Sequence, residues 1–286
     1  MSTWLPSYSQ EAKQQLDSLL DEIVFEDSDL VDALISKEDY KYNFFYLNSS
    51  YDGQSTFAGR DLGLNQFNIT SQLMYFNSSG FNARIYGIWY SELEPHYNVT
   101  GLSIGYSFYP SDNKKWRLRA AYDRYFFADN GSEETSNLSN SLTAGVSYKL
   151  TKNINTSLNS SFLIGNGSVP QLSWSTYGNF KLYKKSYNKY VSFRPSISML
   201  MTSESYVTQF EQFTRRFGTV LVEEEERSFG LMSTRISLPI SLNIKDWDFE
   251  IGYNYILPSS PLGLEDSGLN NVSYISFSIG KLINIK

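Results

Sequence analysis

Eight charged side chains lie within stretches of sequence in which polar and apolar residues alternate. In an extended strand each of them would share a face with the small polar residues of its stretch. Guanidinium and carboxylate groups on one face can form a constriction or track that selects solutes, or they can pair with one another and pack the space shut. Both interpretations stay open from the sequence. The eight residues are Arg84, Arg117, Arg119, Asp123, Arg194, Arg235, Asp248 and Glu250.

The elements that would position these residues begin near residue 40, where the composition changes. Residues 1–39 contain ten acids and two lysines, a net charge of −8, whereas the rest has 20 acids and 22 bases. In this leader the apolar residues fall at helical spacing, so a short acidic helical segment is predicted, followed by a second domain over 40–286. The helical stripe consists of Leu16, Leu19, Leu20, Ile23 and Val24.

Beyond residue 40 the period changes from 3.6 to 2 and stays there. Such regular alternation without intervening helices predicts an up-and-down meander of about twelve strands, although ten or fourteen are not excluded. A turn or two of helix in 205–220, or a further hairpin over 205–222, are both compatible with the sequence. The predicted strands are 40–50, 63–77, 81–92, 96–109, 115–128, 138–150, 154–164, 170–184, 189–203, 228–244, 246–257 and 271–284.

The connections between these strands differ at the two ends. One set is short, such as NSSG at 77–80, and the alternate set is mostly long, as at 204–227 and 258–270. Fifteen of the twenty acids beyond residue 40 lie at the long-loop end, including the run 223–226, and all twelve lysines lie at the short-turn end. Short turns at one end and long loops at the other are typical of transmembrane barrels. The twelve are Lys41, Lys114, Lys115, Lys149, Lys152, Lys181, Lys184, Lys185, Lys189, Lys245, Lys281 and Lys286.

The faces of the strands indicate how such a sheet would be solvated. In 96–109, Leu102, Ile104, Tyr106 and Phe108 alternate with glycine and serine. A barrel of twelve strands is too wide to be filled by one layer of side chains. The sequence therefore predicts an all-β fold, a closed antiparallel transmembrane β-barrel with apolar side chains towards lipid and polar ones towards a hydrated lumen. Strand residues beyond the 9 to 11 that span the hydrocarbon would project past it.

With these features the sequence resembles the outer-membrane β-barrel proteins of Gram-negative bacteria. The Tyr-, Asn- and Ser-rich texture and the leader QLDSLLDEIVFEDSDLVDAL look most like barrels of the Bacteroidota. The resemblance covers residues 40–286 and points to no functional subfamily. It implies a bacterial outer-membrane location with both termini in the periplasm. The C-terminal GKLINIK departs from the pattern, since many such barrels end on an aromatic residue.

Catalysis and cofactor binding are not expected. The chain has no cysteine, so a metal site with cysteine ligands is not possible. Its one histidine, His96, is not part of a recognisable catalytic constellation. Outer-membrane phospholipase A uses a histidine with a serine two positions later, and here that position is Asn98. Outer-membrane aspartyl proteases use paired aspartates. Glu92 and Glu94, near His96, resemble that arrangement only weakly.

The favoured function is therefore non-enzymatic: an accessory or structural component of the outer membrane, or a narrow, plugged channel. The alternatives are a selective diffusion pore and, least favoured, an outer-membrane hydrolase. Expected partners are outer-membrane lipid and lipopolysaccharide, and a protein partner bound through residues 1–39 or loop 204–227, with no nucleic acid. The acidic leader would serve as a plug against a basic rim or as a docking arm.

Overall fold

The computed structural model describes most of the chain from Asn43 onwards. The acidic leader predicted over residues 1–39 lies outside the described residues. These residues are 43–57, 60–61, 66–77, 79–92, 95–111, 113–128, 138–165, 167–186, 189–214, 218–260 and 269–284.

Strands account for most of this part of the chain, because apolar and polar residues alternate over ten or more positions at a time. Within the described residues there is no helix long and apolar enough to cross a membrane. The strands are β1 (Asn43–Asp52), β2 (Thr56–Phe57), β3 (Arg60–Asp61), β4 (Asn68–Asn77), β5 (Phe81–Tyr90), β6 (Tyr97–Phe108), β7 (Trp116–Phe127), β8 (Asn140–Lys149), β9 (Ile154–Ile164), β10 (Ser168–Gly178), β11 (Phe180–Ser186), β12 (Lys189–Phe193), β13 (Ser196–Thr214), β14 (Gly218–Ile244), β15 (Trp247–Pro258) and β16 (Val272–Asn284).

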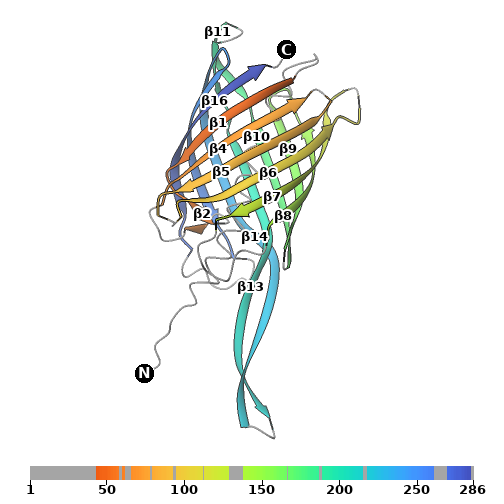
Figure 1. Ribbon diagram of the computed structural model, residues 1–286, viewed down its shortest axis with the longest axis vertical. Helices are drawn as coiled ribbons and strands as arrows, with labels where there is room; N and C mark the ends of the chain where they lie inside the picture. The colour runs from red at the N-terminus through yellow and green to blue at the C-terminus, as the bar shows by residue number, and fades with distance from the viewer. Residues whose placement is uncertain are drawn as a thin grey trace.

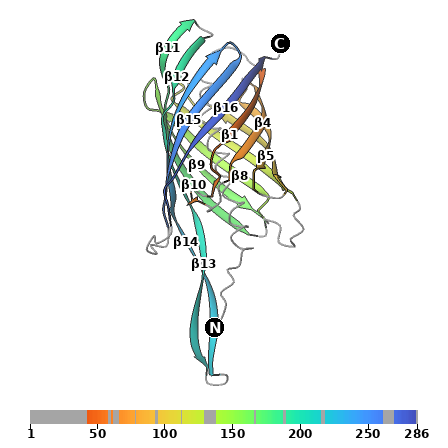
Figure 2. The same ribbon diagram turned by 90° about the vertical axis from the view of Figure 1, so that its left-hand side faces the viewer.

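Twelve strands of the described chain close into a single antiparallel ring (Figure 1, Figure 2). Chain neighbours are sheet neighbours from β4 to β10, and the ring continues through β13, β14, β15 and β16. It closes where β16 pairs with β1, from Phe44↔Asn284 to Asp52↔Ser276. The predicted all-β barrel of twelve strands is confirmed, and the alternatives of ten and fourteen strands are wrong.

Two members of the ring are interrupted at the same level. Pro195 has no N–H to donate to a neighbour, and it separates β12 from β13. The pairing nevertheless continues through the break, since Gly178 N donates to Pro195 O at 2.8 Å and Arg194 N donates to Pro239 O at 3.0 Å. The predicted strands 170–184 and 189–203 are therefore each two strands, β10 with β11 and β12 with β13.

Residues 204–214 and 218–227 are strand, where a loop with a turn or two of helix was expected. β13 and β14 remain paired from Ser196↔Ser237 as far as Thr214↔Gly218. Their outer neighbours stop earlier, because β10 reaches only Thr202 of β13 and β15 reaches only Ser233 of β14. The hairpin considered for 205–222 is thus present, as an extension of these two strands beyond the ring.

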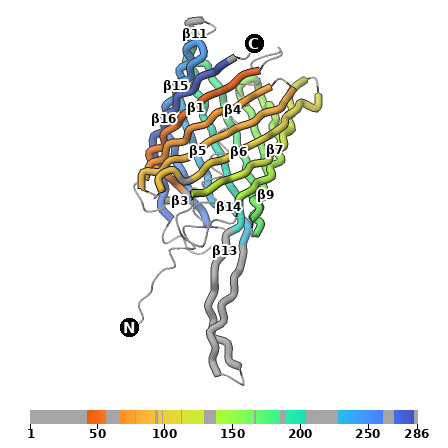
Figure 3. Tube along the Cα trace, viewed as in Figure 1, coloured from red at the N-terminus to blue at the C-terminus, as the bar shows by residue number. Residues whose placement is uncertain are grey.

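The connections sort by length largely as predicted. The turns around Gly80, Lys114 and Lys245 are tight and have positive φ at these residues, of 99°, 49° and 54°. A Cβ at Gly80 would overlap the Ser107 carbonyl oxygen, so this turn requires glycine. One connection at the opposite end is also short, since β9 and β10 are joined through Gly165–Gly167 with Gly165 N donating to Gly167 O. Figure 3 follows the trace between the two ends.

The two faces of the ring are chemically distinct. On β6, Leu102, Ile104 and Phe108 are exposed outward, Ile104 by 54%, while Ser107 is 6% exposed on the other face. The same alternation runs through β15 and β16, where Phe249, Ile251 and Ile275 are exposed. The buried face carries many polar side chains: Asn48, Asn68, Thr70, Gln72, Ser107, Ser141, Thr143, Ser157, Asn159, Gln171, Ser173, Ser175, Ser241 and Asn254. The predicted orientation, apolar outward and polar inward, is confirmed.

Tyrosine rings cover glycines on the inner wall. Tyr86 faces Gly101 directly across β5 and β6, and a Cβ at Gly101 would overlap the Tyr86 ring. Tyr46 covers Gly280 of β16 in the same way. Both tyrosines are 2% exposed, and their rings lie against the inner wall. A residue larger than glycine at 101 or 280 would displace these rings towards the lumen.

Gly101→Ala is expected to lower the free energy of unfolding by about 1–3 kcal/mol, because the added methyl overpacks the Tyr86 ring. Urea unfolding in detergent micelles, followed by tryptophan fluorescence, measures the change. Gly167→Ala is the matched control, since nothing lies within 4 Å of its added Cβ. Equal stability of the two variants would contradict the packing described here.

Candidate functional site: charged residues on the inner face

Four of the eight predicted residues form a cluster on β5 and β7, which we call the Arg84 cluster: Arg84, Arg117, Arg119 and Asp123. Arg84, Ser103 and Asp123 occupy one row across β5, β6 and β7, which places the two charged groups on either side of a serine. Arg84 Nη2 lies 3.7 Å from Asp123 Oδ1, with side-chain exposures of 10% and 2%. The Arg84 guanidinium also lies 4.5 Å from the Tyr86 ring centroid. Arg84 is thus fixed between a carboxylate and an aromatic face.

The other two arginines of the cluster are held by neighbouring strands. Arg117 Nη2 donates to Ser107 Oγ at 3.1 Å. Arg119 lies over Gly145 of β8, where an added Cβ would lie 2.9 Å from Arg119 Nε. Glycine at 145 therefore makes room for this side chain. Three guanidiniums and one carboxylate give the cluster a formal charge of +2.

A small cavity of about 70 Å³ adjoins this cluster. That volume has room for several water molecules, since each water needs on the order of 10–15 Å³. Its lining combines polar and basic side chains with small and apolar ones. The lining includes Arg84, Ser103, Ser107, Arg117, Arg119, Asp123 and Thr143, together with Met74, Phe76, Asn82, Ala83, Gly105, Tyr106, Ala120 and Ala121.

Three more predicted residues form a second group, the Arg194 cluster: Arg194, Asp248 and Glu250. Arg194 forms ion pairs with Asp248 at 3.6 Å and with Glu250. Its Nε also donates to Ser241 Oγ at 3.0 Å, and Ser241 Oγ donates to Glu250 Oε2 at 2.6 Å. The arginine that precedes Pro195 is thereby bound to β14 and β15, so this network fastens the interrupted strand to its neighbours.

Arg235, the eighth residue, occupies the inner row of β14, between Ser198 of β13 and Ile256 of β15. It is half-buried. The structure thus brings seven of the eight residues into two clusters of mixed charge, one with more basic and one with more acidic groups.

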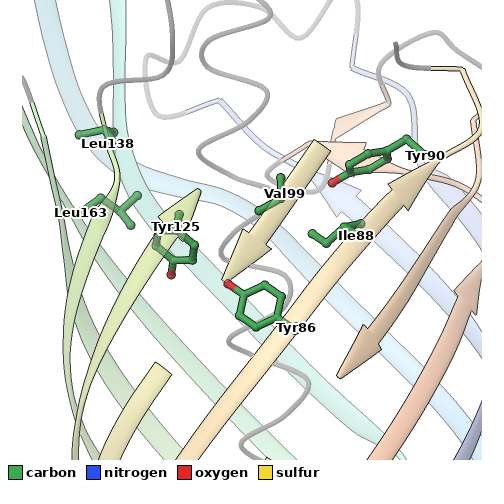
Figure 4. Close-up of a cluster of buried hydrophobic side chains, with 7 residues drawn as sticks. All are labelled: Tyr86, Ile88, Tyr90, Val99, Tyr125, Leu138 and Leu163. Carbon is green, nitrogen blue, oxygen red and sulfur yellow. The ribbon is translucent and has the colours of Figure 1, made fainter. Parts of the chain in front are cut away.

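Sequence reasoning missed an apolar patch on the same inner face (Figure 4). Tyr86, Ile88 and Tyr90 follow one another along β5, with Val99 and Tyr125 on the next strands. Leu138 and Leu163 complete this cluster, which we call the inner apolar patch. The signal was present in the sequence: in YGIWY (86–90) the inward positions carry large aromatic or apolar side chains, so the alternation of polarity fails there.

His96 lies at the long-loop end, outside both clusters. Its Nδ1 lies 3.0 Å from the carbonyl oxygen of Tyr90, and its ring lies 5.3 Å from that of Trp89. These contacts serve the connection between β5 and β6, in which Tyr90 N also donates to His96 O.

Comparison with known proteins adds little to this geometry. No family model matches the sequence, and no curated protein matches it significantly. Solved structures match in outline: the NanC porin (13% identity, TM-score 0.44, covering 85% of this chain and 100% of that one), the KdgM porin (8%, 0.47, 84% and 99%) and LpxR from Salmonella typhimurium (8%, 0.44, 83% and 99%). Such low identities and TM-scores carry no functional argument.

Asp123→Ala is expected to lower the free energy of unfolding by about 3 kcal/mol, because it leaves Arg84 buried without its carboxylate. Urea unfolding in micelles measures the effect, and Arg84→Ala/Asp123→Ala should recover part of the loss. Asp246→Ala, which removes an exposed acid at a turn, is the control. Equal stability of Asp123→Ala and this control would show that the Arg84–Asp123 pair contributes nothing.

Proposed function

We propose that this chain is an integral outer-membrane β-barrel whose polar lumen is a narrow, non-enzymatic channel for small solutes, closed by its own acidic leader. The observation that carries the proposal is the closed ring with apolar side chains outside and charged and polar side chains inside. A pore for polar solutes through a bilayer requires that combination.

The outer surface supports insertion into a bilayer. Exposed leucine, isoleucine and phenylalanine side chains surround the ring, and such a continuous apolar surface would be unfavourable in water. Most ring strands have 10 to 13 residues, enough to cross the hydrocarbon at a tilt. Trp116 and Trp247 are exposed near the short-turn end and Trp89 is the penultimate residue of β5 at the other, as expected of interfacial aromatic belts.

The orientation follows from the connections. Bacterial barrels place short turns in the periplasm and longer loops outside, so the short-turn end, with its lysines, would face the periplasm. Asn43 and Asn284 both lie at that end, which would place the leader and the C-terminus there too. We propose a Gram-negative source, and the Tyr-, Asn- and Ser-rich composition favours the Bacteroidota.

The leader is proposed as the plug because of the inner apolar patch. Tyr90 and Val99 are 0% exposed although they lie on the inner wall. A single layer of wall side chains does not fill a ring of twelve strands, so further chain is needed to cover them. The stripe from Leu16 to Val24 matches the patch in polarity, and the leader's acids complement the net positive charge of the Arg84 cluster. Eighteen residues, 25–42, can extend about 60 Å, enough to run the length of the lumen.

A second candidate function is supported by the β13–β14 extension. Between Ser203 and Met232 these strands pair with each other but with no further strand of the described chain. A hairpin projecting from a barrel is suited to contact a protein partner, which would make this chain an accessory component, with the leader as a docking arm. Affinity purification from native membranes, with and without residues 1–39, distinguishes the two: a stable complex lost with the leader favours the accessory function.

Single-channel recording in planar bilayers tests the channel. The full chain is expected to give rare or small current steps, and deletion of residues 1–39 is expected to give stable, larger ones because the lumen is then open. Current steps of equal size in the full chain and in the shortened one would exclude the plug. Silence in both, with insertion verified by protease protection in liposomes, would exclude the channel and leave the accessory function.

The absence of native cysteine allows a second test of the plug. The thiol of Ile88→Cys, on the inner apolar patch, is expected to react with a charged maleimide only after deletion of residues 1–39. Asn113→Cys, in an exposed turn, should react in both forms and serves as the control. Rapid labelling of Ile88→Cys in the full chain would show that the leader does not cover the patch.

A further inference from the structure

Charge is nearly excluded from the outward face of the ring. Among the outward-facing side chains that the structure describes on the twelve ring strands, two are charged: Arg124 on β7 and Lys281 on β16. They lie towards opposite ends. Arg124 is three residues from the long-loop end of β7, and Lys281 is three residues from the short-turn end of β16.

Lys281 needs no further explanation. Its ammonium lies 4.8 Å from the ring centroid of Trp247, next to the turn that joins β14 and β15. A flexible lysine at a barrel rim can also extend its charge into the aqueous interface.

Arg124 is held differently, by a preformed polar cluster on the lipid-facing wall. Its Nη1 donates to Ser139 Oγ at 3.0 Å and to Asn140 Oδ1 at 2.9 Å. Tyr122 Oη donates to the same Asn140 oxygen at 2.7 Å. The guanidinium lies 5.7 Å from the ring centroid of Phe126. Three neighbouring side chains therefore fix the position of the guanidinium.

All of these partners are uncharged, and no carboxylate of the described residues pairs with Arg124. Both hydrogen bonds use Nη1, which leaves Nε and Nη2 with donors to offer. A guanidinium has a planar arrangement of donors that binds two oxygens of a phosphate at once. A cation on the lipid face is unfavourable in proportion to its depth, and an anionic group supplied by the lipid would offset that penalty.

We propose that Arg124, positioned by Ser139 and Asn140, binds a phosphate of a lipid headgroup in the leaflet at the long-loop end. The inference rests on the membrane insertion in the proposed function, but not on the channel being open or closed. A lipid is favoured over free phosphate because exposed apolar residues surround the cluster, with Phe126 and Leu142 beside it. These would contact the acyl chains of the lipid while the guanidinium holds its phosphate.

Native mass spectrometry of the full chain in detergent tests the site with two probes, diphosphoryl lipid A and the same lipid without its phosphates. Arg124→Gln is expected to weaken binding of the phosphorylated probe roughly tenfold, the loss of one charged hydrogen-bonded contact. Binding of the phosphate-free probe should be unchanged. Lys281→Gln, which removes the other outward cation, is the matched control and should bind both probes as the unaltered chain does.

Three results would overturn the proposal. These are equal affinity of Arg124→Gln and the unaltered chain for diphosphoryl lipid A, an equal loss in Lys281→Gln, or displacement of the lipid by inorganic phosphate. A shift in gel mobility on heating verifies that each variant is folded. The channel proposal fails by electrical silence whatever lipid is bound, so the two failures are distinguishable.

Discussion

Closure of the hydrogen-bonded ring is the constraint on which the other features depend. Hydrocarbon offers no water to the backbone, so every N–H and C=O at that depth needs a partner within the protein. The ring supplies these partners without leaving an edge, through the β16–β1 pairing and through the β14–β15 pairing. Even at Pro195, backbone hydrogen bonds continue on both sides of the interrupted strand. Closure also fixes the faces, because a slip of one residue would exchange the apolar and polar rows.

The interior follows from the size of that ring. Twelve strands enclose more space than one layer of side chains can fill, so the inner wall can carry charged groups with room for water. The arginines are nevertheless not left alone: Arg84 faces Asp123, and Arg194 faces two carboxylates. Mixed charge of this kind keeps the wall ordered while it stays polar. The inner apolar patch interrupts this polarity, and it is the feature that suggests an occupant of the lumen.

Much of the fold was predictable because its signal is local. Alternation of period two gave nine of the twelve ring strands with modest errors at their ends, and the sorting of lysines gave the two ends. The exceptions are the two interrupted strands and β14, which begins ten residues earlier than predicted. The interruption at Pro195 had a readable signal, a proline inside an apparent strand. The two charged clusters had no such local signal in the sequence. Arg194 and Glu250 are 56 positions apart, and only the register of the closed ring brings them together. The loop expected over 204–227 is instead an extension of β13 and β14 over 204–214 and 218–227, which the alternative of a hairpin over 205–222 had allowed for.

The central claim is that the apolar face of the strands touches lipid and the polar face does not. Single cysteines at Leu102, Ser103 and Ile104 of β6, each labelled with a fluorophore, test it directly in liposomes that contain brominated lipid. The account predicts strong quenching at Leu102 and Ile104 and weak quenching at Ser103, since bromine on acyl chains quenches only fluorophores that contact the bilayer. Quenching that is strongest at Ser103, or equal at all three positions, would contradict it.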